Sequence, residues 1–255
     1  GGGPTGMTAA KEAARAGYDV VLVEKEEQLG GNLKKFSKLF PKKSPYRVPE
    51  PVDLESSIKE IDESDRIKVH LGTSIKSITG QPGQFDVSLK TNGTTSEFRA
   101  GAIVQATGWK PYDASKLGHL GYGSPNVITN VQMEELIASG KIMRPSDGKP
   151  ARKIVFVQCA GSRDKDHLPY CSAVCCRVTL KQAMLAREIF FTKGEVIGVN
   201  EAGESNLVVD VENTLLGEKI QVEADLVVLA TGMVPNSADG EAIRKFRDAQ
   251  ATIEK

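Results

Sequence analysis

The sequence predicts an α/β fold made of two similar units, and three features support this prediction. A glycine-rich turn at the N-terminus leads into an alanine-rich helix and then into an apolar strand at 19–24. A hydrophobic strand that ends in Ala-Thr-Gly occurs twice, at 102–108 and at 225–232. The apolar segment 153–159 has the composition of a buried parallel strand and opens the second unit. This repetition is typical of two dinucleotide-binding, Rossmann-like units.

The composition is that of an ordinary water-soluble domain, with 40% hydrophobic and 26% charged residues among 255. Basic and acidic residues are equal at 33 each, so charge gives no support to nucleic-acid binding. No apolar run approaches the roughly 20 residues that a membrane helix needs. The N-terminal residues lack the basic-then-apolar pattern of a signal peptide. We therefore expect a cytoplasmic protein without a membrane span.

The first glycine motif predicts a dinucleotide site. Gly1, Gly3 and Gly6 form G-x-G-x-x-G, and Glu24 follows at the end of the first predicted strand. The first glycine permits a tight turn, the second lets the backbone approach a pyrophosphate, and the third lets helix and strand pack closely. The phosphates would lie at the helix N-terminus, and Glu24 would accept hydrogen bonds from ribose hydroxyls.

The elements between the glycine motif and the first Ala-Thr-Gly segment follow from local patterns. A fingerprint of this kind normally follows a strand, so we expect the chain to be part of a longer polypeptide. A basic stretch at 34–47 precedes a predicted helix at 53–61. We interpret it as a solvated loop, with a docking surface for an acidic partner or membrane headgroups as the alternative. Further strands are predicted at 67–71, 75–78, 85–89 and 95–98, with a hairpin turn at Asn92-Gly93.

The second unit is predicted to be incomplete. A helix at 178–189 is followed almost at once by strands at 194–199, 206–211, 219–222 and 225–230. A complete βαβ unit of about 30 residues needs another strand and helix there, so we expect roughly 25–40 residues to be absent near 189–192.

All four cysteines fall within one stretch, with the spacing C-x11-C-x3-C-C: Cys159, Cys171, Cys175 and Cys176. Cysteines that serve only as small hydrophobic residues are scattered instead, so this grouping predicts a ligand set. On a helix, Cys171 and Cys175 would share a face, and Cys176 would point about 100° away. Such a set suits an iron–sulfur cubane. A zinc site, a redox disulfide beside a flavin, and incidental buried cysteines remain as alternatives.

The second unit lacks the glycine motif that would bind NAD(P)H. The predicted strand at 153–159 ends in Gln158-Cys159 and continues as Ala160-Gly161-Ser162-Arg163, so a cysteine stands where the phosphate-binding turn would begin. His167, within the cysteine loop, is interpreted as an ordinary loop residue, with tuning of a cluster as the alternative. No acid–base pair or nucleophile–histidine arrangement supports hydrolysis, so we predict no catalytic side chain.

The residues V-Q-C-A-G-S-R-D and L-P-Y-C-S-A-V-C-C resemble the family of flavoprotein A subunits of heterodisulfide reductase. A closer resemblance, carried by K-L-F-P-K-K-S-P-Y-R, A-T-G-W-K-P-Y-D-A and A-T-G-M-V-P-N-S-A-D-G, is to the larger flavoprotein subunit of the quinone-interacting membrane-bound oxidoreductase of sulfate reducers. The segment E-K-x-x-x-L-G-G is similar to the one after the ribose-binding acid in FAD enzymes with two dinucleotide-binding domains.

The resemblance implies a fold of the FAD-dependent disulfide-reductase type, in which the second domain has lost NAD binding. It implies an FAD-binding domain at 1–145 and 236–255 and a degenerate NAD-type domain at 146–235. A [4Fe–4S] cluster would be held by Cys159, Cys171, Cys175 and Cys176. The residues expected to contact FAD are Gly1, Gly3, Gly6, Glu24, Lys25, Gly30, Gly31, Asn32, Ala106, Thr107 and Gly108.

The function implied by the resemblance is electron transfer within a multi-subunit redox complex. The complex would relay electrons between the membrane quinone pool and a sulfur-metabolism enzyme such as adenylylsulfate reductase. A membrane-anchored, quinone-reactive partner would hold the chain at the cytoplasmic face. The rival hypotheses are an NAD(P)H-dependent flavin oxidoreductase and a non-catalytic zinc or thiol scaffold.

Overall fold

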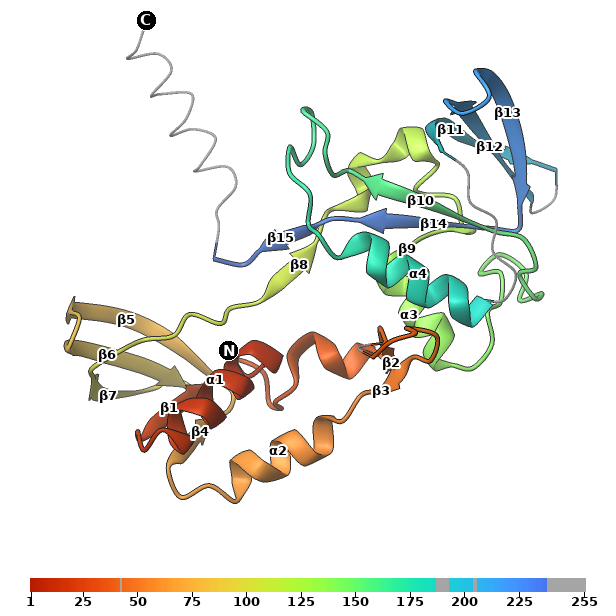
Figure 1. Ribbon diagram of the computed structural model, residues 1–255. Helices are drawn as coiled ribbons and strands as arrows, with labels where there is room; N and C mark the ends of the chain where they lie inside the picture. Colours follow the sequence, from red (N-terminus) through yellow and green to blue (C-terminus); the bar gives the residue numbers. More distant parts are fainter. Residues whose placement is uncertain (42, 187–192, 204–205, 238–255) are drawn as a thin grey trace, which may run out of the picture. The chain divides into compact units, whose positions relative to one another are not determined.

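The computed structural model describes residues 1–41, 43–186, 193–203 and 206–237, which form two compact units (Figure 1). The first unit contains Gly1–Lys34, Val52–Trp109 and the residues from Pro235. The second contains Lys35–Pro51 and Lys110–Val234. Division by compactness thus places 110–145 with the second unit, whereas we had assigned these residues to the FAD-binding domain. The assignment of domains by cofactor stays a prediction.

The first unit is built around a short parallel sheet covered by two helices. Helix α1 (Pro4–Arg15) has proline at its first position, where the missing N–H costs nothing, and ends before Gly17, which has a φ of 93°. Helix α2 (Leu54–Asp62) begins at Asp53, whose carboxylate accepts from the Ser56 N–H. Strands β1 (Val20–Val23) and β4 (Ile67–His70) pair in parallel. Their core consists of Met7, Ala10, Leu22, Leu29 and Ile61.

A three-stranded antiparallel meander completes this unit. It comprises β5 (Thr73–Gln81), β6 (Gln84–Thr91) and β7 (Thr94–Ala100). The predicted turn between the last two strands is confirmed, because Asn92 and Gly93 have φ angles of 48° and 87°, the values that a tight hairpin turn requires.

The predicted strand at 102–106 is wrong. This segment forms no strand, and Ile103 and Val104 are 39% and 69% exposed. A buried parallel strand needs neighbours that pair with its backbone and cover its faces. Within the described part of the chain, no strand pairs with this segment, so its apolar composition does not produce the predicted element. Two short strands, β8 (Trp109–Pro111) and β15 (Met233–Pro235), pair with each other.

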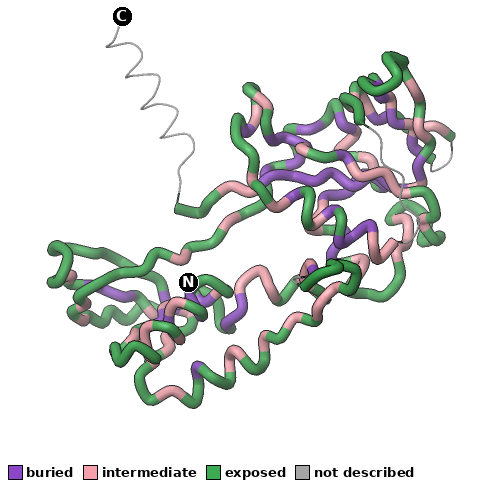
Figure 2. The backbone as a smooth tube through the Cα atoms, viewed as in Figure 1, coloured by how far each residue is buried: buried purple, intermediate pink, exposed green. Residues whose placement is uncertain are grey.

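The second unit has a parallel sheet in the order β10-β14-β9 (Figure 1). Strand β14 (Leu226–Thr231) lies between β10 (Ile154–Ala160) and β9 (Val127–Thr129), and all six of its residues are buried, as Figure 2 shows. Helices α3 (Asn130–Ala138) and α4 (Cys175–Ala186) pack beside this sheet. The same unit contains two short helical turns, η2 (Ala114–Lys116) and η3 (Gly118–Leu120). It also contains a pair of short strands, β2 (Lys38–Leu39) and β3 (Glu50–Pro51).

A second antiparallel meander follows: β11 (Gly194–Ala202), β12 (Asn206–Asn213) and β13 (Glu218–Ala224). The strands predicted at 153–159, 194–199, 206–211, 219–222 and 225–230 are therefore confirmed. The predicted helix at 178–189 begins three residues earlier, at Cys175. Its predicted end, and the predicted break near 189–192, lie outside the described residues.

None of the helices in the described ranges is long and apolar enough to cross a membrane.

Candidate functional site

The glycine turn of the first unit is held by close backbone approaches. A Cβ on Gly6 would lie 1.8 Å from the carbonyl oxygen of Gly1, and a Cβ on Gly1 would lie 2.3 Å from that of Ala106. No side chain fits at either position. At Gly3 the nearest atom to such a Cβ is the Gly31 Cα, 3.9 Å away. Gly3 is therefore not required by packing inside the protein, and the open space beside it is where a ligand's phosphates would lie.

Glu24 lies directly after β1 and is only 6% exposed. Its carboxylate accepts hydrogen bonds from the backbone N–H of Gly2 and, at 2.9 Å, from that of Glu26. The carboxylate thus fixes the glycine turn, and each oxygen keeps a further lone pair for a ribose hydroxyl. The side chain of the neighbouring Lys25 is 75% exposed and forms an ion pair with Glu26 at 3.5 Å.

The segment after Glu24 returns to the glycine turn. The N–H of Gly30 donates to the carbonyl of Gly2 at 2.8 Å. Gly31 has a φ of 51°, and a Cβ there would lie 2.9 Å from the Gly3 Cα. The Asn32 amide donates to the Trp109 carbonyl at 3.4 Å. These contacts place Gly30 and Gly31 beside the turn and Asn32 beside Trp109, and their contact with FAD stays a prediction.

The Ala-Thr-Gly segment of this unit contacts a residue that the sequence analysis missed. The side-chain amide of Asn236 donates to the Thr107 carbonyl at 2.8 Å, and its backbone N–H donates to the Gly108 carbonyl at 3.0 Å. Gly108 has a φ of 70°. The signal was present in the sequence, because Asn236 follows the second Ala-Thr-Gly segment within the motif A-T-G-M-V-P-N.

The four cysteines lie together in the second unit, where β10 ends and α4 begins. Cys159 is near the end of β10, Cys171 is in the connecting loop, and Cys175 and Cys176 are the first residues of α4. The prediction that Cys171 and Cys175 share a helical face is wrong, because Cys171 precedes the helix. Cys171 lies in the loop that precedes α4, and its Sγ accepts a hydrogen bond from the N–H of Ala173 at 3.3 Å.

The cysteine loop has unequal exposure and an unusual backbone. Cys175 is buried, Cys159 is partly buried, and Cys171 and Cys176 are exposed; all four are free thiols. Burial raises the pKa of the Cys175 thiol, and the nearby sulfurs of Cys159, Cys176 and Cys171 raise it further. The Cys175 thiol donates to the Thr231 carbonyl at 3.5 Å. Positive φ angles at the non-glycine residues Cys159, Arg163 and Ala173 are costly, and such conformations gather at functional sites.

The four thiols of this loop are the number of ligands that a cubane takes. Among the described residues, no three His, Cys, Asp or Glu side chains are arranged to hold one metal ion. The ligands of a cubane bind different irons, so their sulfurs need not converge on one point. In the same loop, the buried Ser162 hydroxyl has no hydrogen-bond partner among the described residues. A buried hydroxyl without a partner is free to donate a hydrogen bond to an acceptor bound at this site.

The ring of His167 contacts two other side chains of the second unit. Its Nδ1 lies 2.8 Å from the Tyr112 hydroxyl, and its ring stacks on His119 with centroids 6.0 Å apart. These contacts give both histidines a structural role.

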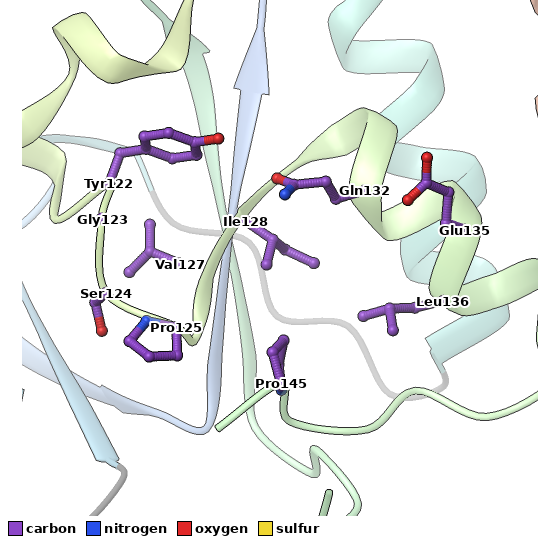
Figure 3. Close-up of a pocket in the computed structure, with 10 residues that line it drawn as sticks. All are labelled: Tyr122, Gly123, Ser124, Pro125, Val127, Ile128, Gln132, Glu135, Leu136 and Pro145. Atoms are coloured by element: carbon purple, nitrogen blue, oxygen red, sulfur yellow. The ribbon is translucent and has the colours of Figure 1, made fainter. Parts of the chain in front are cut away.

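A separate open hollow of about 380 Å³ lies along β9 and α3 (Figure 3). Its lining includes Tyr122, Ile128, Gln132 and Leu136, and none of the predicted site residues. Only one carboxylate, Glu135, borders it. We assign it no role.

Comparison with known proteins identifies the class. Residues 1–141 match the pyridine nucleotide-disulphide oxidoreductase family, and the chain belongs to this family. The predicted fold class is thereby confirmed, as is the prediction that the chain is part of a flavin-dependent oxidoreductase.

Within that class, the chain is similar to the A subunits of heterodisulfide reductases. It is 28% identical to the second of two such iron-sulfur subunits of the CoB--CoM heterodisulfide reductase of Methanopyrus kandleri, over 94% of this chain and 54% of that protein. It is 26% identical to the corresponding subunit of the ferredoxin/F(420)H(2)-dependent CoB-CoM heterodisulfide reductase of Methanosarcina acetivorans, over 93% of this chain and 44% of that one. The resemblance predicted from the cysteine loop is confirmed at this level.

The chain spans about half the length of the curated relatives that it matches. The alignment with the Methanopyrus kandleri relative extends over 360 positions, although this chain has 255 residues, so that relative carries segments within the aligned span that this chain lacks.

Solved structures with similar folds include T. acidophilum thioredoxin reductase, at 18% identity and a TM-score of 0.48, covering 93% of this chain and 76% of that one. L-proline dehydrogenase from P. horikoshii has 19% identity and a TM-score of 0.48, covering 92% of this chain and 41% of that one.

Proposed function

We propose that this chain is the FAD- and [4Fe–4S]-binding part of an electron-transfer subunit in a multi-subunit redox complex. The observation that carries the proposal is the gathering of all four cysteines at the end of β10 and the start of α4. In a unit that binds NAD(P)H, this position would hold the phosphate-binding turn. When bound, FAD exchanges electrons in pairs and an iron–sulfur cluster exchanges them singly, so together they connect two-electron with one-electron partners.

The protein's own residues have three tasks in this proposal. The glycine turn and Gly31 leave room for the pyrophosphate, and Glu24 fixes that turn while offering lone pairs to the ribose. The cysteine loop provides four thiolates. The burial of Cys175 disfavours its free thiolate, so the negative charge there needs the metal to stabilise it.

We further propose the physiological setting implied by the sequence resemblance. The chain would act with a membrane-anchored, quinone-reactive partner at the cytoplasmic face and with a sulfur-metabolism enzyme such as adenylylsulfate reductase. Support for a multi-subunit complex comes from the relatives, whose names describe them as subunits of heterodisulfide reductases. Support for the sulfate-reducer setting is the sequence resemblance alone.

The test is the metal and flavin content of anaerobically purified protein. We expect about four iron and four sulfide per chain with a visible cluster absorbance, together with one FAD. A Cys175→Ser variant should lose the cluster and keep the FAD, because each site lies within its own unit. Stoichiometric zinc, or a disulfide between Cys175 and Cys176 in the native protein, would refute the proposal.

A further inference from the structure

The segment Lys35–Pro51 differs in charge from the rest of the chain. Between Leu33 and Pro49 the sequence contains no acidic residue, whereas the whole chain has equal numbers of acidic and basic residues. The same stretch contains six basic residues: Lys34, Lys35, Lys38, Lys42, Lys43 and Arg47. Lys42 lies outside the described residues.

The segment folds into a projecting loop, which we call the basic loop. Strands β2 and β3 pair at its base, and residues 43–48 at its tip are all exposed. Tyr46 and Val48 are 54% and 76% exposed. Within the described part of the chain, no carboxylate forms an ion pair with Lys43 or Arg47. The tip therefore presents uncompensated positive charge beside two apolar side chains.

The base of the basic loop contacts the ammonium of a buried ion pair that joins α4 to α3. Lys181 of α4 lies 2.7 Å from the carboxylate of Glu134, and the two side chains are 6% and 1% exposed. The same ammonium donates to the carbonyl of Lys38 at 3.0 Å and lies 5.0 Å from the centre of the Phe36 ring. Gln182 donates to Glu134 at 2.8 Å. The loop is thus attached to a fixed point on the helix.

That helix is the one that begins with Cys175 and Cys176. Lys181 follows Cys176 by five residues, which corresponds to about 8 Å of helix. The base of the basic loop is therefore attached to the same helix that carries Cys175 and the exposed Cys176.

We propose that the basic loop is the docking surface for an acidic electron-carrier protein. The inference rests on the proposed function, because it uses the cluster as the site of electron exchange. Opposite charge accelerates the encounter, and electron-transfer complexes use small interfaces that a single loop can provide. Tyrosine and arginine are the residues on which protein interfaces depend most, and both stand at the tip. The tyrosine and arginine at the tip favour a protein interface over a lipid surface, and the test below distinguishes the two.

The test compares two double variants of the full chain with FAD and cluster bound. Lys43→Gln/Arg47→Gln removes the charge at the tip. Lys141→Gln/Lys219→Gln removes the same charge from two exposed lysines elsewhere in the same unit. Binding to an acidic ferredoxin and to an acidic flavodoxin is measured by biolayer interferometry at low and high salt. We expect the tip variant to bind about five- to tenfold more weakly at low salt, and the control variant to bind like the original protein.

Three outcomes would overturn the docking proposal. The first is that neither carrier binds, and the second is that both double variants bind alike. The third is binding to phosphatidylglycerol vesicles that depends on Lys43 and Arg47 while no carrier binds, which would favour a membrane surface. Failure of the proposed function is distinguished by iron and sulfide analysis. If the cluster-free Cys175→Ser variant still binds the carrier through the tip, the docking surface is supported. The metal content of the original protein then decides the electron-transfer role separately.

Discussion

At the scale of single residues, the three glycines of the N-terminal motif serve different purposes. Gly1 and Gly6 are required by the protein itself, since a Cβ at either would overlap a backbone carbonyl. Gly3 has room for a Cβ and an extended backbone with a φ of −75° that any residue can adopt. The structure therefore separates the two glycines that the fold requires from Gly3, which we predict a ligand requires.

We expect Gly3→Val and Gly6→Val to fail in different ways. Gly3→Val should melt at nearly the original temperature but be purified without FAD, because the side chain occupies the phosphate space. Gly6→Val should lose at least about 1–3 kcal/mol of stability, as overpacked substitutions do. Thermal melting of the apoprotein and flavin absorbance measure the two effects. Full FAD content in Gly3→Val would contradict the assigned site.

Cluster-free protein should show an order of thiol reactivity. At pH 7 the exposed Cys171 and Cys176 should react with iodoacetamide before Cys175, because burial and a raised pKa keep the Cys175 thiol protonated. The difference should narrow as the pH rises, because alkaline pH favours the Cys175 thiolate in spite of its raised pKa. Peptide mass spectrometry after timed quenching measures the order, and a Cys175 that reacts first would contradict it.

At the scale of elements, the sequence predicts strands well where the pairing partners are present. The six residues of β14 were predicted by their apolar run and are buried between two neighbours. The similar run at 102–106 forms no strand, because composition alone cannot provide the hydrogen bonds of adjacent backbone. Strand β9 and helix α3 were missed, although Thr129 and Gln132 form a capping box that the sequence displays as T-x-x-Q.

The cysteine loop shows a similar limit. Residue spacing grouped the four thiols correctly, but it placed Cys171 on the helix. The helix begins only at Cys175, and Ala173 between them has a φ of 59°, a left-handed conformation that no spacing rule reveals for alanine.

The buried ion pair between Lys181 of α4 and Glu134 of α3 makes an element-scale prediction. Lys181→Met leaves the buried Glu134 carboxylate without its cation, so we expect a loss of about 3–5 kcal/mol in the free energy of unfolding. Lys219→Met, at an exposed position in the same unit, should change stability by less than about 0.5 kcal/mol. Urea denaturation of both variants measures the difference. Equal stability of the two variants would show that this buried pair does not stabilise the folded chain.

At the scale of the whole molecule, each candidate site is built within one unit. The residues around the glycine turn come from three stretches of the first unit, and the four cysteines come from one stretch of the second. The second unit has kept a parallel sheet but has a cysteine where a phosphate-binding turn would begin. One unit is therefore suited to a nucleotide cofactor and the other to a metal cluster.

This division predicts that nicotinamide cofactors do not reduce the flavin directly. The backbone at the end of β10 turns through positive φ angles at Cys159 and Gly161 and offers no G-x-G-x-x-G sequence to NADH or NADPH. Anaerobic mixing of the FAD-loaded protein with either nucleotide should leave the flavin absorbance unchanged over minutes, whereas dithionite should bleach it. Bleaching by NADH without partner proteins would favour the NAD(P)H-dependent oxidoreductase hypothesis.

The segment 102–106 also has a consequence for the behaviour of the purified chain. Ile103 and Val104 are exposed beside backbone groups that no strand in the described residues pairs. Such a segment is a template for pairing with another molecule, and proteins commonly protect these positions with lysine. The chain should therefore self-associate as its concentration rises, and Val104→Lys should suppress that association in sedimentation experiments. Solubility of this polypeptide would then be limited by one short apolar segment rather than by its neutral net charge.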